Sequence, residues 1–129
     1  MSKPYSYGAL PDSSRWIRLL ILAPGTFNAP LSIRLKNTNL DAVDAYTALS
    51  WRWSKPTETT TLKVDQDETL TISQNLESAL QALRDETENV VLWVDQVCIN
   101  QMDSTEKLLQ IPLMGKIYSK ARSTVGWLG

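Results

Sequence analysis

Carboxylates are the strongest candidates for chemistry in this sequence, because it contains no histidine. Histidine is the commonest general base and a frequent zinc ligand, so its absence argues against Ser-His or Cys-His nucleophile pairs and nearly all zinc sites. Asp95 follows the continuous apolar run at 90–94, and Glu106 lies in the next polar segment. We therefore take Asp95 and Glu106 as the candidate catalytic residues.

Each carboxylate also has a structural alternative. The segment 103–106 has the sequence of a capping box, in which Glu106 returns to the backbone N–H of the N-cap residue, and we favour this role. Asp95 is predicted at the end of a strand, where open α/β sheets bind ligands. It could equally accept backbone N–H bonds from the loop at 98–101.

Polar and aromatic residues extend this candidate site. Asn100 and Gln101 could form hydrogen bonds with a ribose or an amide of a ligand. Side-chain amides in a tight loop more often form hydrogen bonds with local backbone groups. Near the end of an earlier strand, tryptophans could stack on a nucleotide and Arg52 could meet a phosphate, with core packing as the alternative for tryptophan. The candidate ligand-binding residues are Ser50, Trp51, Arg52, Trp53, Asp95, Asn100 and Gln101.

Other reactive groups are scarce. Cys98 has no histidine partner and no second thiol, so we interpret it as a small buried side chain, not as a nucleophile or metal ligand. The five glycines are scattered, which argues against a Gly-rich phosphate loop. We predict no metal site and no certain cofactor.

The composition is that of an ordinary globular protein, with 43% hydrophobic and 21% charged residues in 129. A net charge of -1 gives no electrostatic footprint for nucleic acid or an acidic membrane, so neither is an expected partner. The longest apolar stretch, 17–24, contains Arg18 and is too short to span a bilayer. A single cysteine and an N-terminus without an apolar signal-peptide region indicate the cytoplasm.

The elements that must position these residues alternate between strand and helix. The predicted strands lie at 16–22, 31–36, 46–51, 90–94 and 124–128, with a small surface hairpin at 62–72; the predicted helices lie at 75–85 and from 103 onward, the second bent at Pro112. This order predicts one α/β domain with a central, mainly parallel βαβαβ sheet. The first two strands should form an antiparallel hairpin at an edge of that sheet.

Two segments carry a family resemblance. The sequence LWVDQVCINQMD at 92–103 resembles the central block of the HET (heterokaryon incompatibility) family, written L-W-I-D-x-x-C-I-N-Q-x-D. The sequence YTALSWRWS at 46–54 is similar to the family's first block, Y-x-A-L-S-Y-x-W-G. This sequence departs from the family at Trp51, Ser54 and Pro112, and the family's third block would lie beyond Gly129. We therefore interpret residues 1–129 as the N-terminal part of a HET domain.

The resemblance implies a cell-death effector or signalling module for fungal non-self recognition. It would act through self-association and protein partners, forming a homo-oligomer on activation. HET domains have been proposed as distant relatives of TIR domains, which implies a TIR-like or flavodoxin-like sheet and an alternative function as an NAD-cleaving hydrolase. In that alternative a nucleotide such as NAD is the ligand of a pocket formed by Ser50, Arg52, Asp95 and Asn100.

The same resemblance raises an obstacle to catalysis. In NAD-cleaving TIR domains the essential glutamate lies on the helix after the third strand, which here would begin after Gly129. Glu106, or a glutamate of another chain, would have to replace it. A third alternative is therefore a truncated, inactive HET scaffold.

Overall fold

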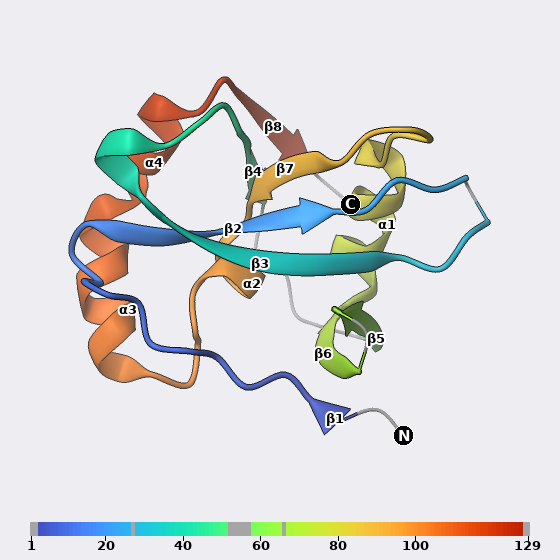
Figure 1. Cartoon of the computed structure of the whole chain (residues 1–129), viewed down its shortest axis with the longest axis horizontal. Coiled ribbons are helices and arrows are strands. Elements are labelled where there is room, and N and C mark those ends of the chain that lie inside the picture. Colours follow the sequence, from blue (N-terminus) through green and yellow to red (C-terminus); the bar gives the residue numbers. More distant parts are fainter. Residues whose placement is uncertain (1–2, 27, 52–57, 66, 128–129) are drawn as a thin grey trace.

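The computed structural model describes residues 3–26, 28–51, 58–65 and 67–127 of the protein. The side chains of residues 51 and 127 are not described. Within these ranges helices pack against one mixed sheet of eight strands, which confirms the predicted α/β class (Figure 1). The strands are β1 (Lys3–Pro4), β2 (Trp16–Leu22), β3 (Ser32–Asn39), β4 (Thr47–Trp51), β5 (Thr59–Val64), β6 (Glu68–Ser73), β7 (Val90–Trp93) and β8 (Ser123–Trp127). The helices are α1 (Gln74–Leu83), α2 (Asp95–Cys98), α3 (Ser104–Gln110) and α4 (Met114–Lys120), with 3-10 turns η1 (Leu40–Ala42) and η2 (Ile111–Leu113).

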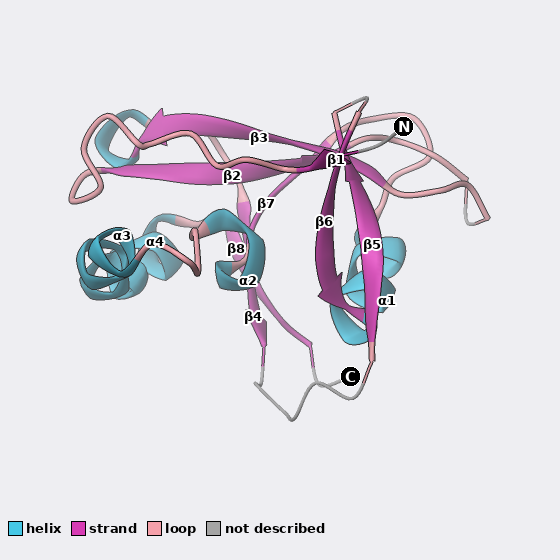
Figure 2. Ribbon diagram, turned by 90° about the horizontal axis from the view of Figure 1, so that it is seen from below, coloured by secondary structure: helices cyan, strands magenta, loops and turns pink. Residues whose placement is uncertain are grey.

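One end of the sheet is the predicted parallel unit. Strand β4 pairs in parallel with β7 on one side and with β8 on the other, so the strand order here is β7-β4-β8. Figure 2 shows α1 on one side of these strands and α3 with α4 on the other. Parallel neighbours require long crossover connections, and these helices lie in the two crossovers.

The prediction of a mainly parallel sheet is wrong. The complete order is β1-β6-β5-β3-β2-β7-β4-β8, and the β2–β3 hairpin lies in its middle instead of at an edge. Strand β2 pairs antiparallel with both β3 and β7. Residues 17–22 are all buried, and an apolar strand of this kind is stable where it has neighbours on both edges. The predicted TIR-like or flavodoxin-like arrangement stays a prediction.

The small hairpin β5–β6 is confirmed as a hairpin but is not a surface feature. Strand β5 pairs with β3 and continues the sheet, while β6 pairs antiparallel with β5. Leu62, Val64 and Ile72 alternate with polar residues and are buried in the core. The two strands therefore extend the core, because their apolar face packs against α1.

Both predicted helix starts are confirmed by their caps. The Ser73 hydroxyl accepts the Leu76 N–H at the start of α1, and the Asp103 carboxylate accepts the Glu106 N–H at the start of α3. The predicted bend at Pro112 is also confirmed, since the 3-10 turn η2 separates α3 from α4. No helix in the described ranges is long and apolar enough to cross a membrane.

Candidate functional site

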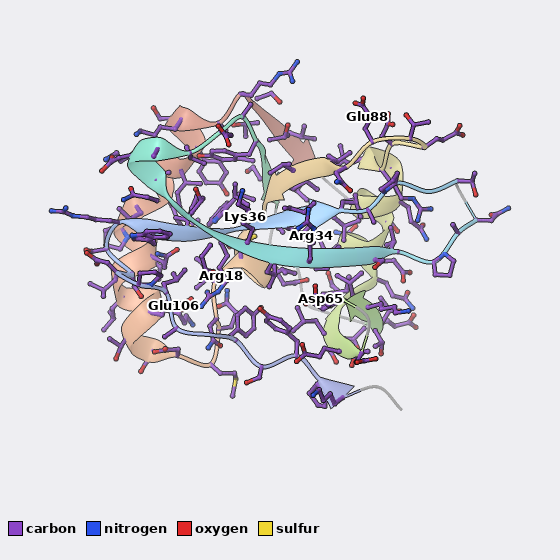
Figure 3. The ribbon with its side chains drawn as sticks, in the orientation of Figure 1. Arg18, Arg34, Lys36, Asp65, Glu88 and Glu106 are labelled. Atoms are coloured by element: carbon purple, nitrogen blue, oxygen red, sulfur yellow. The ribbon has the colours of Figure 1, made fainter. Side chains whose placement is uncertain are left out.

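Glu106 forms a buried, bidentate ion pair with Arg18 of β2. The Arg18 Nη1 lies 2.7 Å from Glu106 Oε2, and Nη2 lies 2.8 Å from Oε1. The exposed fractions of the two residues are 1% and 3%. Figure 3 shows both side chains in the space between β2 and α3. Such a planar, two-point contact is the strongest form of charged hydrogen bond, and here it joins the sheet to the start of a helix.

The rest of this cluster is closed by backbone groups. The Asn100 N–H donates to Glu106 Oε2 at 2.6 Å, and Arg18 donates to the carbonyls of Gly8 at 2.7 Å and Cys98 at 3.3 Å. The Tyr7 ring centroid lies 4.9 Å from the guanidinium carbon. We call Tyr7, Gly8, Arg18, Asn100 and Glu106 the buried arginine cluster.

This cluster corrects half of the predicted capping box. Asp103 caps the Glu106 N–H as expected, at 3.1 Å. Glu106 does not return to the Asp103 N–H, which donates to the Asn100 carbonyl instead. The carboxylate is held by Arg18 because a buried guanidinium is costly without an opposite charge. An arginine inside the apolar strand 17–22 was the signal in the sequence for this partner.

Asp95 lies at the carboxyl end of β7, as the first residue of α2. Ser50, near the end of the neighbouring strand β4, shares a hydrogen bond with the Tyr118 hydroxyl of α4. Burial raises the pKa of Tyr118, the Asp95 carboxylate raises it further, and the Ser50 hydrogen bond opposes them. Ser50, Asp95 and Tyr118 therefore form one group, the carboxyl-edge site, where parallel sheets bind ligands.

Tyr118 was not among the predicted site residues. It packs edge-to-face against Trp93, with 5.6 Å between ring centroids, and the Trp93 indole N–H is buried without a hydrogen-bond partner among the described residues. No local pattern indicates this contact, because it depends on how α4 packs against the sheet. The carboxyl-edge site thus combines a carboxylate and two hydroxyls, and the Trp93 indole packs against one of its members, Tyr118.

Asn100 and Gln101 make local backbone contacts, as their structural alternative predicted. The Asn100 side-chain oxygen accepts the Met102 N–H at 3.1 Å, and Gln101 donates to the Asp95 carbonyl at 2.8 Å. Both residues also line an open pocket of about 370 Å³ beside β6, which includes neither Ser50 nor Asp95 in its lining. The structure therefore separates the predicted ligand-binding residues into two places.

Comparison with known proteins identifies the family. Residues 46–129 match the family model described as heterokaryon incompatibility protein (HET). The chain belongs to the HET family. It is 35% identical over 138 aligned residues to heterokaryon incompatibility protein 6, OR allele, of Neurospora crassa, an alignment that covers 97% of this chain. The chain spans 20% of the length of that relative. No solved structure matches it.

The HET motif at 92–103 is explained here largely by packing and local bonding. Leu92, Trp93, Cys98 and Ile99 are buried, while Asn100 and Gln101 hold the turn that follows. Burial raises the pKa of the Cys98 thiol to about 12, in agreement with its predicted packing role. The polar residue of the motif that reaches the carboxyl edge is Asp95.

Some predicted site residues lie outside the described part of this HET chain. Arg52 and Trp53 fall between β4 and β5, and the side chain of Trp51 is likewise outside it. Their predicted contact with a nucleotide stays a prediction. Within the described residues there is no group of three or more Cys, Asp or Glu side chains that could hold a metal ion.

Proposed function

We propose that this chain is a module of fungal heterokaryon incompatibility. In this proposal it is a cytoplasmic cell-death effector or signalling domain for non-self recognition, acting through self-association and protein partners. The observation that carries the proposal is the 35% identity to heterokaryon incompatibility protein 6 across 97% of the chain. The HET match at 46–129 supports it independently.

The structure adds two supporting observations. Glu106 is enclosed in the buried arginine cluster, which gives this carboxylate a structural role and removes it from solvent. Apolar side chains are exposed on and beside α3, with exposed fractions of 94% for Met102, 72% for Leu108 and 54% for Ile111. Neighbouring exposed apolar residues are typical of surfaces that bind other proteins.

Induced expression of residues 1–129 in a filamentous fungus should arrest growth. The reason is that, in this proposal, the HET region at 46–129 triggers the cell-death response. Colony growth and dye uptake would be measured after induction. The matched control is the chain that begins at Tyr46, which lacks β2, should not fold, and should leave growth normal at an equal rate of synthesis. Normal growth with well-folded wild-type protein would contradict the proposed function and favour an inactive scaffold.

The carboxyl-edge site supports a second candidate, a TIR-like hydrolase that cleaves NAD. Asp95, Ser50 and Tyr118 lie together at the end of parallel strands, where nucleotides bind in many α/β proteins. In this candidate the Asp95 carboxylate stabilises positive charge that develops on the ribose as nicotinamide leaves. Glu106 is not available for that role while it is paired with Arg18.

The two candidates differ in the release of nicotinamide. The purified chain, incubated with NAD at high protein concentration, would be analysed by chromatography. The hydrolase candidate expects release that Asp95→Asn abolishes and that Asp44→Asn, a change at an exposed residue, leaves intact. The signalling candidate expects no release from the folded wild type. Release that persists in Asp95→Asn would rule out the carboxyl-edge mechanism.

A further inference from the structure

The outer edge of β6 has partners at both ends but not in the middle. Strand β5 pairs with the inner edge of β6 along its whole length, from Glu68 to Ser73. On the outer edge, β1 pairs only with Glu68 and Thr69. The Tyr5 N–H donates to the Thr69 carbonyl at 2.8 Å, and the Ser73 N–H donates to the Gln96 side-chain oxygen at 3.3 Å. Thr69 and Ser73 therefore face away from β5, and both are bonded there.

Thr71 lies between these two residues and faces the same way. Backbone N–H and C=O groups reverse direction from one residue of a strand to the next, so residues 69, 71 and 73 share the outer edge. No strand in the described ranges pairs with Thr71 on that edge. The N–H and C=O of one extended residue lie side by side and point the same way. Thr71 thus presents one donor and one acceptor together beyond the sheet.

These two backbone groups lie at the pocket of about 370 Å³ beside β6, which we call the β6 pocket. Its lining includes Thr71 and also Gln96, the outward partner of Ser73, so the pocket lies at the outer edge of the strand. Helix α2, which carries Gln96, lies on the far side of β6 from β5 (Figure 2). The Tyr7 hydroxyl donates to the Val97 carbonyl at 2.6 Å, which holds this lining residue against α2.

The inner surface of the β6 pocket is uncharged and largely apolar. Tyr7, Leu70 and Met102 contribute apolar surface, and none of the described residues that line the pocket carries a charge. A charged group held here would lose water without gaining an opposite charge. The volume lies in the range of about 300–1,000 Å³ that is typical of small-molecule sites. These features select a small, uncharged ligand.

Two side-chain amides add donors to the same pocket. The Gln96 side-chain oxygen accepts the Ser73 N–H, and the Asn100 side-chain oxygen accepts the Met102 N–H at 3.1 Å. Because both oxygens are used in this way, the NH2 groups are the parts of these amides that can serve a ligand. A ligand with a second carbonyl group would therefore find a further donor.

We propose that the β6 pocket binds a small uncharged heterocycle through a lactam edge, a cyclic amide whose N–H and C=O point to the same side. The Thr71 N–H donates to the lactam carbonyl, and the lactam N–H donates to the Thr71 carbonyl. This contact reproduces the pair of hydrogen bonds that two opposed residues exchange in an antiparallel sheet. Uracil, with a lactam edge and a second carbonyl, is the simplest ligand of this class.

An added peptide strand fits this edge less well than a small ligand does. A peptide that extends a sheet gains affinity from successive backbone hydrogen bonds along the edge. Here the neighbouring outward residues are already bonded, Thr69 to Tyr5 and the Ser73 N–H to Gln96. Thr71 is exposed, so a small molecule reaches it from solvent without displacing β1.

The first test titrates the isotope-labelled chain with uracil and follows the backbone amides by NMR. Amide shifts at 70–73 and 96–102 should change and saturate, with a dissociation constant of about 1 mM or lower. The matched ligand is 1,3-dimethyluracil, which has the same ring and carbonyls but no lactam N–H. It should bind about tenfold more weakly or not at all, since it cannot donate to the Thr71 carbonyl and its methyl group fills that space.

The second test changes the protein and compares Thr71→Pro with Thr71→Ala. Proline removes the outward N–H of Thr71, which makes no bond to β5, so the ladder between β5 and β6 stays complete. Alanine removes the same side chain and keeps the N–H. Thr71→Ala should bind uracil as the wild type does, and Thr71→Pro should bind it about tenfold more weakly or not at all.

Three results would each overturn the proposal: no saturable shifts with uracil, equal binding of uracil and 1,3-dimethyluracil, or saturable shifts confined to residues outside the β6 pocket. Equal binding of uracil by the folded proline and alanine variants would overturn it as well. If Thr71→Pro fails to fold, the comparison of the two ligands on the wild type decides the question. The inference does not rest on the proposed function, and these measurements need neither a fungal host nor NAD.

Discussion

Replacement of Glu106 by alanine should lower the free energy of unfolding by about 3–5 kcal/mol, because it leaves the Arg18 guanidinium buried without an opposite charge. Arg18 has an exposed fraction of 1%, so water cannot replace the lost carboxylate without opening the structure. A domain of this size is stable by about 5–15 kcal/mol. The loss should therefore be visible as a shifted denaturant midpoint, followed by tryptophan fluorescence.

Two controls separate the buried ion pair from general effects of mutation. Lys116→Ala breaks an exposed pair with Asp41, at 3.2 Å, and should change the midpoint little. The double variant Arg18→Leu with Glu106→Leu removes both charges and should recover part of the loss, since the two residues interact directly. A Glu106→Ala protein as stable as Lys116→Ala would show that the arginine cluster does not hold the fold together.

A chain that begins at Tyr46, where the HET family match begins, should not fold. Strand β2 is missing from such a chain, and β7 loses its antiparallel neighbour. Full burial of one large aliphatic side chain contributes about 1.5–3 kcal/mol, and β2 supplies Ile17, Leu19, Leu20 and Leu22 to the core. Far-ultraviolet circular dichroism, followed as the temperature rises, should show no cooperative unfolding transition for this chain.

The control for this truncation is a chain that begins at Tyr5. It loses β1, which pairs with β6 at the exposed edge, but keeps Tyr7 and Gly8 of the arginine cluster. Both this chain and the complete chain should unfold cooperatively. Cooperative unfolding of the chain that begins at Tyr46 would mean that the HET match is a complete folding unit.

Local patterns in the sequence predicted the elements better than their arrangement. The helix at 74–83, the apolar strand at 90–93 and the break at Pro112 each follow from spacing or backbone chemistry within a few residues. The parallel direction of β4, β7 and β8 follows from the alternation of strands and helices, whereas their order does not. The position of β2 does not, because nothing local distinguishes an apolar strand paired on one edge from one paired on both.

The same division holds for the candidate site. The position of Asp95 at a strand end, the local bonds of Asn100 and Gln101, and the burial of Cys98 could be predicted from neighbouring residues. The Arg18–Glu106 pair joins residues 88 positions apart, and the Ser50–Tyr118 contact depends on how α4 meets the sheet. Contacts of that range require the tertiary fold, which the periodicity of one sequence does not specify.

The central position of β2 also determines how long this strand lacks one of its two neighbours while the chain is being synthesised. The strand is complete at Leu22, whereas its partner β7 begins at Val90, nearly 70 residues later. Ribosomes add about 5–20 residues each second, so one edge of a largely apolar strand lacks its native neighbour for about 3–14 s. The hairpin with β3 can form early, and cellular factors that bind extended apolar segments have seconds in which to reach the edge that remains open.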